Sequence, residues 1–476
     1  MTCQRCHFLI NYNTAINVTV TPDDYVEIIS KIKDEYALAI VMIDLLDFPC
    51  SIWPGIKDIL GPKRPIFIVG NKVDLLPKDS PNYLNHIKEC LRQESMRIGF
   101  EEKHIRNISL ISAKTGYGVE ELITQLHNVW KYKGDVYLIG CTNVGKSSLF
   151  NALLRSDYCK VEASNIIQKA TACPWPGTTL RMLKFPILRP SDHRIYMRTQ
   201  RLKSERTQKN AETKLRRDQA ITTKKVEHAT LIGHIGRTFE PEKDEVSDPV
   251  SQSHDSGFTG KILTLNENSK NYIQSKWCFD TPGVVQPDQI LHLLTTDEII
   301  KTIPKEMIKP RTFIMKPSLT MFIAGLGRLD FVQGPPSIRV TAYSSLELPI
   351  TICETADAEE FYENFLGSEI MGVPIDSGEE RLAKWPKLQV SEDILVEGEE
   401  KHITVCDILL SSAGWVGINL PRDSSGIFRA WTPEQRGIYV RCPALLPYGV
   451  NLRGPRIRHS LAYRISESFT FQRLKK

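Results

Sequence analysis

A glycine-rich loop is the segment of this sequence whose residue types and spacing are best suited to bind phosphate. Residues 140–147, Gly-Cys-Thr-Asn-Val-Gly-Lys-Ser, follow a short apolar stretch and precede a helical start at 148–154. Gly140 and Gly145 allow the backbone amides to turn toward phosphate oxygens, Lys146 can reach the terminal phosphates, and Ser147 can ligate Mg²⁺. A chance glycine-rich turn seldom carries this full pattern between a strand and a helix. We therefore predict a nucleotide phosphate site, which also includes Asn143, Val144 and Ser148.

Two further segments are candidates to complete the Mg²⁺ and phosphate site. The acid of Asp280-Thr-Pro-Gly283 is expected to hold Mg²⁺ through water, and the Gly283 amide can sense the terminal phosphate. Alone, this tetrapeptide would more often be an ordinary turn. Pro176-Gly-Thr178-Thr179 offers a hydroxyl for the same metal, and we favour Thr179 over Thr178. The predicted Mg²⁺ ligands are accordingly Ser147, Thr179 and Asp280.

Base selection is predicted for two other segments, Asn71-Lys72-Val73-Asp74 and Ser112-Ala113-Lys114. A guanine edge presents two N–H donors side by side, which one carboxylate accepts together, whereas adenine has no such pair. Asp74 should therefore select guanine. We expect Asn71 to bridge the two loops, the Lys72 stem to cover the base, and the Ala113 amide to donate to guanine O6. Each segment is weak evidence alone, but both occur in one chain with a phosphate loop.

Hydrolysis requires an oriented water and neutralisation of the charge on the transferred phosphoryl group. Many GTPases orient the water with a glutamine directly after Asp-x-x-Gly, but here that position is Val284, which cannot polarise water. We therefore expect a slow intrinsic rate. Asn143 is similar to the asparagine that coordinates K⁺ in cation-activated GTPases; the alternative is a loop residue that tolerates the backbone geometry. The predicted catalytic residues are Lys146, Asn143 and Thr179.

These segments follow apolar runs that are typical of buried parallel strands, at 38–44, 65–69, 108–111 and 135–139. Between the last two runs, Val119, Leu122, Ile123, Leu126 and Trp130 recur at helical spacing. Strands that alternate with helices, with functional loops at the strand carboxyl ends, predict an α/β fold with a doubly wound, mainly parallel sheet.

The order of the motifs is unusual. In the common G-domain order the phosphate loop comes first and the base motifs last, whereas here 71–74 and 112–114 precede 140–147 and 280–283. We interpret this as a circular permutation with the original ends joined near 131–135. Because the termini of compact domains often lie close together, the sheet can survive such rewiring. The segment after Gly283 then leads directly into the C-terminal part.

We predict that residues 21–310 form the permuted G domain. Within it, about 190–271 are rich in Lys, Arg, Gln, Ser and Thr, which predicts a basic, partly disordered insertion. Residues 311–476 contain short alternating segments separated by Gly and Pro, which indicate a β-rich C-terminal domain with a basic tail.

The overall composition is that of a soluble globular protein, with 476 residues, 41% hydrophobic, 25% charged and a net charge of +5. No apolar run approaches the roughly 20 residues that span a bilayer, although peripheral membrane association stays open. The 11 cysteines have no regular spacing, which favours reduced thiols over a disulfide framework. Neither a secretory signal nor a transit peptide is visible.

The motifs together resemble a known family, the YqeH-like circularly permuted GTPases, and within it a mitochondrial branch. The resemblance covers most of the chain and is strongest over 38–185. It rests on Cys3-Gln-Arg-Cys6, Val41-Met-Ile-Asp44-Leu-Leu-Asp47, Gly70-Asn-Lys-Val-Asp-Leu-Leu-Pro77, Ile111-Ser-Ala-Lys-Thr-Gly-Tyr-Gly-Val-Glu-Glu-Leu122, Gly134-Asp-Val-Tyr-Leu-Ile-Gly140 and Pro174-Trp-Pro-Gly-Thr-Thr179.

The resemblance implies a mitochondrial matrix GTPase that takes GTP and GDP with Mg²⁺ and acts in assembly of the small ribosomal subunit. It also implies a C-terminal part similar to the RNA-binding attenuation protein fold. Members of the family have a zinc site built from two cysteine pairs, whereas this chain has only Cys3 and Cys6. The resemblance therefore implies that residues 1–20 are the remnant of an N-terminal zinc-finger half. Because two thiolates cannot close a tetrahedral zinc site, either the upstream pair is missing from a truncated sequence or the site has decayed. Cys50 and Cys90 are expected to be packing residues.

Two partner classes remain open from the sequence. A ribosome-associated GTPase that binds ribosomal RNA is favoured by the resemblance, by a basic run at 198–225 and by a basic tail with interleaved aromatics. The alternative is a signalling or scaffold GTPase that binds protein only, because charge runs are usually solvated surface. A metabolic ATPase is a third and poorer alternative. The tail residues are Arg453, Arg456, Arg458, His459, Arg464, Arg473, Lys475 and Lys476, with Tyr448, Tyr463, Phe469 and Phe471.

Overall fold

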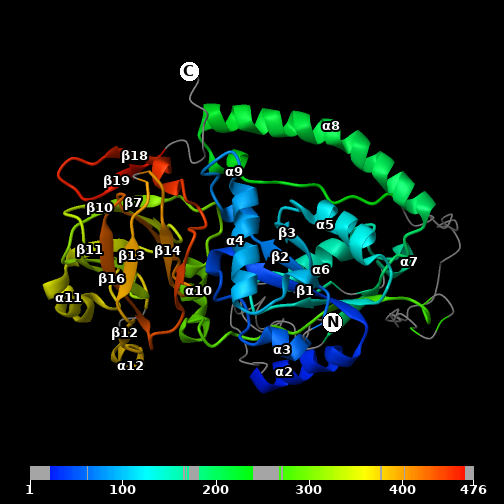
Figure 1. Ribbon diagram of the computed structural model, residues 1–476, viewed down its shortest axis with the longest axis horizontal. Coiled ribbons are helices and arrows are strands. Elements are labelled where there is room, and N and C mark those ends of the chain that lie inside the picture. Colours follow the sequence, from blue (N-terminus) through cyan, green and yellow to red (C-terminus); the bar gives the residue numbers. More distant parts are fainter. Residues whose placement is uncertain are drawn as a thin grey trace, which may run out of the picture.

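The structure is a computed structural model of the whole chain. It describes residues 22–61, 63–164, 167, 169–170, 182–239, 267, 269, 272–375, 378–400 and 402–466. An α/β part and a β-rich part lie side by side, and one long helix runs along the outside of the α/β part (Figure 1).

The α/β part is built on a six-stranded sheet with the strand order β3-β2-β1-β4-β6-β5. All neighbouring pairs are parallel except β5 with β6. The central strand, β1, is buried along its whole length, as its uninterrupted apolar sequence predicts. The bounds are β1 Ala37–Asp44, β2 Ile66–Asn71, β3 Ile105–Leu110, β4 Asp135–Ile139, β5 Leu183–Pro186 and β6 Trp277–Asp280. The expected mainly parallel α/β sheet is confirmed.

Helices cover this sheet and bury their apolar sides against it. The apolar residues expected at helical spacing, Val119, Leu122, Ile123 and Leu126, are all fully buried, and their helix continues as a π-helical turn, Leu126–Trp130. The helices of this part are α2 Pro22–Ser30, α3 Ile56–Leu60, α4 Tyr83–Arg97, α5 Val119–Gln125, α6 Lys146–Leu154 and α7 Val161–Ser164. The later helix α10, Thr296–Thr302, packs through Ile299 against the core of the C-terminal part.

The basic insertion begins with a single helix of 32 residues, α8 (Asp192–Thr223), followed by the short α9 (Val226–Ala229). Ser191 caps α8 by accepting a hydrogen bond from the Arg194 amide. Arg198 is the one buried residue of this helix, so nearly all of α8 faces solvent. The first part of the insertion is therefore ordered, while 240–266 fall outside the described residues.

The C-terminal part consists of antiparallel β-sheets, which confirms the expected β-rich region. One sheet has the order β17-β14-β15-β10-β7 and another β11-β8-β9-β16-β12, with β13 paired to β16. The helices here are α11 Ala358–Phe365 and α12 Glu379–Ala383. The strands are β7 Arg311–Met315, β8 Leu319–Ile323, β9 Gly327–Gln333, β10 Ile338–Tyr343, β11 Ile350–Glu354, β12 Leu388–Val390, β13 Ile394–Glu397, β14 Cys406–Leu410, β15 Trp415–Asn419, β16 Ser425–Pro433, β17 Ile438–Arg441, β18 Arg453–Arg456 and β19 Tyr463–Ile465.

The two parts share apolar core. Tyr343, Trp415 and Leu445 of the C-terminal part belong to the same buried cluster as the core of the parallel sheet. At this contact the fully buried Arg441 donates to the Asp407 carboxylate, at 2.6 and 3.0 Å, and to the Phe48 carbonyl at 2.5 Å. A buried ion pair that also bonds backbone of the other part fixes how the two parts meet.

Among the helices that the structure describes, none is both long enough and apolar enough to cross a membrane.

Candidate functional site

The motifs expected to bind nucleotide meet at one edge of the parallel sheet. β2 ends at Asn71, β4 runs into the glycine-rich loop, and β6 ends at Asp280. In this sheet β1 lies between β2 and β4, and Asp44 at its end pairs in register with Asn71. Because carboxyl ends of parallel strands share one edge, segments far apart in the sequence converge there.

The glycine-rich loop has the backbone shape that a phosphate loop needs. Gly140 and Gly145 have φ values of 154° and 96°, and α6 starts directly at Lys146. The buried Lys146 ammonium donates to the carbonyls of Gly140 and Cys141, both at 2.7 Å, and its burial lowers its pKa. The loop thus curls around one buried cation at the amino end of a helix, where anions are favoured.

Two glycines are required here by close approach. A Cβ on Gly145 would lie 2.2 Å from Nδ2 of Asn71, and one on Gly283 would lie 2.8 Å from Nζ of Lys146 and 3.2 Å from Cα of Thr142. Side chains at these positions would displace the base loop or the lysine. The glycines therefore keep three motifs packed together at one point.

Asp280 and Ser147 form the part of the site that suits a divalent cation. The Ser147 hydroxyl donates to Asp280 Oδ2 at 2.8 Å, and the buried Asp280 Oδ1 has no hydrogen-bond partner among the residues that the structure describes. Burial raises the pKa of Asp280 to about 6, partly offset by Lys146 and by the bond from Ser147. A carboxylate and a hydroxyl, side by side with an unsatisfied buried oxygen, are hard oxygen donors that fit Mg²⁺.

The base loops are joined to the phosphate loop by one side chain. Asn71 Oδ1 accepts from the Ala113 amide at 2.9 Å, and Asn71 Nδ2 donates to the Val144 carbonyl at 2.7 Å. The bridge that the sequence predicts between 71–74 and 112–114 is therefore present, and it extends to the phosphate loop. Asp74 is buried beside Ser112, and desolvation raises the pKa of its carboxyl.

Lys72 and Lys114 differ in their surroundings. Lys72 has a left-handed backbone, with φ 67°, and its ammonium forms an ion pair with Asp44 at the end of β1. Sequence reasoning assigned Asp44 no role, although its place after a buried parallel strand was an available signal. Lys114 is more open, and its ammonium lies 3.5 Å from the Lys305 carbonyl.

Of the residues expected near the reacting phosphate, Asn143 has a polar group without a partner in the part of the chain that the structure describes, whereas those after Gly283 are buried or bonded. Asn143 has a left-handed backbone, with φ 61°, which asparagine tolerates, and its buried Nδ2 has no hydrogen-bond partner in the described residues. Val284 is buried, and its carbonyl accepts from the Thr142 amide at 2.9 Å. The next glutamine, Gln286, donates to Asp288 at 2.9 Å. Neither position after Gly283 presents a free polar group to water.

The segment after Gly283 makes contacts with both parts of the protein, which the sequence did not reveal. Gln289 donates to Asp47 at 2.9 Å, and burial raises the pKa of Asp47 to about 7. On the other side, the Tyr439 hydroxyl donates to Asp288 Oδ2 at 2.6 Å and the Ser411 hydroxyl to the Asp288 carbonyl at 2.9 Å. This segment therefore connects the phosphate motifs to β14 and β17.

Several predicted site residues lie outside the described part of the chain. These are Thr178 and Thr179, whose hydroxyls were expected at the metal, and Cys3 and Cys6 of the incomplete zinc site. Across the residues that are described, no group of three or more His, Cys, Asp or Glu side chains is arranged to hold a metal ion. Cys50 and Cys90 are buried, with Cys90 3.4 Å from the His86 ring.

The basic run 198–225 divides into internal and external charges. Arg198 and Arg201 form ion pairs with Glu120 and Asp157, so these two cations are committed within the protein. Lys203, Arg206, Lys214 and Arg217 are exposed. The cations of this run therefore lie on two different faces of the helix. One face is ion-paired within the protein, and the other is exposed.

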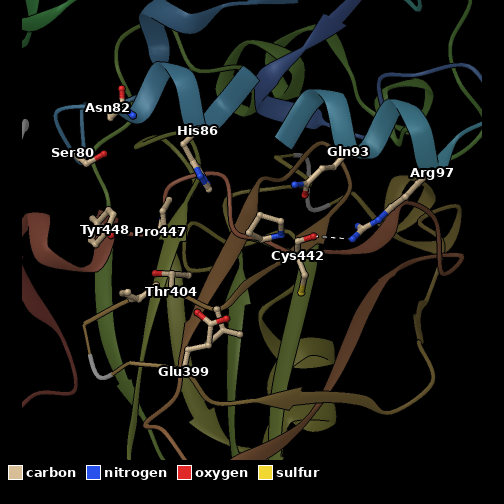
Figure 2. Close-up of a pocket in the computed structure, with 13 residues that line it drawn as sticks. Ser80, Asn82, His86, Gln93, Arg97, Glu399, Thr404, Cys442, Pro447 and Tyr448 are labelled. Carbon is tan, nitrogen blue, oxygen red and sulfur yellow. Dashed lines mark hydrogen bonds between the residues drawn. The ribbon is translucent and has the colours of Figure 1, made fainter. Parts of the chain in front are cut away.

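A separate groove of about 740 Å³ lies between α4 and the C-terminal strands (Figure 2). His86, Gln93 and Arg97 point from α4 toward Cys442, Thr404 and Glu399, and Arg97 donates to the Cys442 carbonyl at 2.9 Å. None of the nucleotide motifs lines this groove, so it is distinct from the candidate site.

Several known proteins are similar to this chain in sequence. A family profile described as "50S ribosome-binding GTPase" matches residues 135–197. The chain is similar to nitric oxide-associated protein 1 of Mus musculus, at 38% identity over 97% of this chain and 72% of that protein. Its similarity to the Homo sapiens protein of the same name is 37% over the same shares. Similarity to the uncharacterized protein YqeH of Bacillus subtilis is 25% over 92% of this chain and 89% of that protein.

Proposed function

The chain belongs to the GTPase family that includes nitric oxide-associated protein 1 and YqeH, and from this premise we propose that it binds GTP and hydrolyses it to GDP and phosphate. The observation that carries the proposal is Asn71, whose single amide joins the base loop at Ala113 to the phosphate loop at Val144. A direct test is release of phosphate from GTP by the purified chain in the presence of Mg²⁺.

In this proposal each motif contacts one part of the nucleotide. Asp74 accepts the two guanine N–H groups, the Ala113 amide donates to O6, and the Lys72 stem, held by Asp44, covers the base. Ser112 and Lys114 complete the base loop. Lys146, the amides of 140–148 and Gly283 hold the phosphates. Ser147, Asp280 and Thr179 would hold Mg²⁺, which neutralises charge on the phosphates when bound.

Potassium is proposed to stimulate hydrolysis through Asn143, since Val284 cannot polarise water and Gln286 is bonded to Asp288. Replacing Asn143 by alanine should abolish the difference between rates in KCl and NaCl. Alanine also strains a backbone with φ 61°, so Asn143→Gly is the matched variant, because glycine adopts this conformation freely. Both variants should lose the potassium response in a phosphate-release assay at constant ionic strength.

The result for Asn143→Gly decides whether Asn143 is a potassium ligand or a residue that only tolerates the backbone geometry. If Asn143→Gly keeps the full potassium response, the asparagine serves backbone geometry alone. Equal rates of the unchanged protein in KCl and NaCl would also refute the cation proposal.

The cellular role that we propose is assembly of the small ribosomal subunit in mitochondria, through contact with ribosomal RNA. Support comes from the family description, which concerns ribosome binding, from the exposed cations of α8, and from the exposed Arg456, Arg458 and Arg464 of the C-terminal tail. That description names the 50S particle, so the subunit has to be tested. With a non-hydrolysable GTP analogue, the chain should co-sediment with small mitochondrial subunits. Sedimentation with large subunits alone would contradict the small-subunit role, and sedimentation with neither would favour a protein-binding GTPase.

RNA affinity is further proposed to depend on the bound nucleotide. The segment after Gly283 bonds to Thr142 in the phosphate loop and, through Asp288, to Tyr439 and Ser411. Loss of the terminal phosphate would thus shift this segment, and its bonds to Tyr439 and Ser411 would transmit the shift to the C-terminal part. With a typical coupling of about 1–3 kcal/mol, RNA affinity should differ roughly 5–150-fold between GDP and the GTP analogue. Titration of ribosomal RNA in the two states measures this factor.

Two variants separate the tail from the coupling path. Deletion should start at 467, because Val450 and Leu452 are buried and a cut at 447 would remove them along with β18 and β19. Loss of Arg473, Lys475 and Lys476 should weaken RNA binding in both nucleotide states. Tyr439→Phe removes only the hydroxyl bonded to Asp288 and should reduce the nucleotide dependence. The same RNA affinity for all proteins in both states would exclude both a contribution of residues 467–476 and the switch.

A further inference from the structure

Helix α8 is unusual because it is polar around almost its whole circumference and yet continues for 32 residues. A helix of this kind needs ion pairs or a partner to be stable in isolation from a core. Its residues include nine Lys or Arg and four Asp or Glu. The distribution of these charges around the helix, and not their number, carries the inference.

One face of α8 is committed to the body of the protein. At 3.6 residues per turn, its anchoring residues fall within an arc of about 60°. Arg201 donates to Glu120 at 3.0 Å and to Asp157 at 3.1 Å, and Arg198 is buried against the same two acids. Farther along, Glu212 bonds His234 at 2.7 Å. The anchoring residues are Arg198, Arg201, Glu205, Glu212 and Arg216.

The opposite face carries a continuous stripe of exposed residues, within an arc of about 80° by the same geometry. From Tyr196 to Ile221 the stripe contains four cations and no acid, whereas Asp192 lies in the same arc at the start of the helix. Lys203 to Arg217 span about 21 Å at 1.5 Å per residue. Its first member, Tyr196, is 59% exposed. The outward stripe consists of Tyr196, Thr199, Lys203, Arg206, Asn210, Lys214, Arg217 and Ile221, all exposed.

The composition of the outward stripe fits the phosphate backbone of RNA. Lysine, arginine, threonine and asparagine all donate to phosphate oxygens, and an exposed tyrosine can stack on an unpaired base. A helix that lies on a membrane instead needs an apolar face along its length. The stripe has bulky apolar groups only at its ends, Tyr196 and Ile221, so a lipid surface fits it poorly.

The anchoring face connects α8 to the proposed nucleotide site. After α9 the chain returns along the base loop, where the Gly233 amide donates to the Thr115 carbonyl at 3.1 Å. The Gly236 amide donates to Glu120 at 3.0 Å, in the first turn of α5. The Arg237 guanidinium donates to the Leu154 carbonyl at 2.6 Å, at the end of the helix that follows the phosphate loop. The segment that follows α8 and α9 therefore contacts both the base loop and the helix after the phosphate loop.

We propose that the outward stripe of α8 binds the phosphate backbone of RNA, and that this binding is linked to guanine-nucleotide binding through residues 231–238. The inference rests on the proposed function, because the linkage requires a nucleotide site. It names an RNA contact separate from the C-terminal tail. By reciprocity, RNA on the stripe changes GTP affinity by the same factor as GTP changes RNA affinity.

The test uses the full chain and a fluorescent RNA hairpin, titrated by anisotropy over a range of salt concentrations. A variant with Lys203→Ala, Arg206→Ala, Lys214→Ala and Arg217→Ala should bind at least about tenfold more weakly. The slope of its log affinity plotted against log salt concentration should be smaller in magnitude by about three to four. This is close to one for each lost phosphate contact. The matched control, Lys31→Ala with Lys103→Ala, removes two exposed cations elsewhere and should leave both quantities unchanged.

Linkage is measured with a second variant on the inward face. Arg201→Gln loses its bonds to Glu120 and Asp157 but leaves the outward stripe intact. Without nucleotide it should bind RNA as the unchanged protein does. The ratio of its RNA affinities with and without a GTP analogue should fall toward one. If this variant does not fold, Arg237→Gln is measured in its place, because it loses the bonds of residues 231–238 to the Leu154 and Arg155 carbonyls and also leaves the outward stripe intact.

An unchanged RNA affinity and salt slope in the fourfold variant would overturn the proposal, and so would tighter binding to anionic vesicles than to RNA. Each titration is repeated without nucleotide, so that failure of GTP binding is recognised separately. If the protein does not bind GTP, the proposed function fails. RNA binding by the outward stripe is then still tested by the titrations without nucleotide.

Discussion

Replacing Lys146 by alanine is expected to reduce GTP affinity at least about a hundredfold and to abolish turnover. Lys146 is the buried cation around which the phosphate loop curls, and no other cation of the described residues lies inside that loop. Hydrogen bonds to charged groups contribute about 1.5–3 kcal/mol each, so losing two to the phosphates is about 3–6 kcal/mol. Titration with a fluorescent GTP analogue measures the loss.

A matched control substitution is available near the opposite end of β4. Lys133 is exposed just before the amino end of β4, whereas Lys146 follows its carboxyl end. Lys133→Ala should bind GTP normally, and both variants should keep their thermal transition within a few degrees of the unchanged protein. If Lys146→Ala binds GTP normally while folded, the phosphate loop is assigned wrongly.

Replacing Asp74 by asparagine is expected to change the preferred base from guanine to xanthine. The new amide exchanges one acceptor for a donor, which opposes the guanine amino group but pairs with the xanthine oxygen at the same position. Asp74 is almost fully buried, so a mismatched group there cannot turn to water. Sites that hydrogen-bond a substrate in this way discriminate strongly, and we expect GTP affinity to fall at least about a hundredfold.

Competition between GTP and xanthosine triphosphate measures this change. Asp79→Asn is the control, because Asp79 is another buried acid with a pKa raised by burial, but it bonds the Tyr448 amide outside the base loops. Its ratio of GTP to xanthosine triphosphate affinity should match that of the unchanged protein. An unchanged ratio in Asp74→Asn would exclude Asp74 from base recognition.

Much of the parallel sheet was predictable because its strands are apolar along their length. The segment 135–139 has the bounds expected for it, and Asn71 bridges the base loops as its residue type suggests. Such features depend on local sequence and on the shared edge of parallel strands. Both can be inferred without tertiary contacts.

Other features depended on contacts distant in sequence and could not be inferred. The composition of the insertion predicted partial disorder but not where an ordered helix would lie. Glu120 and Asp157 anchor Arg198 and Arg201 and so hold α8 to the protein. In the same way, nothing near Gly283 in sequence indicates that Asp288 bonds Tyr439, 151 positions later. Tertiary ion pairs of this kind override local composition.

The most direct measurement of the central claim is nucleotide selectivity combined with turnover in the unchanged protein. A fluorescent GDP analogue is bound in Mg²⁺ and KCl and then displaced by unlabelled GTP or ATP, while phosphate release from each is followed. The account predicts displacement by GTP at concentrations at least about a hundredfold lower than by ATP, and phosphate release from GTP. Equal displacement by ATP, or no phosphate release from GTP even with ribosomal particles present, would contradict it.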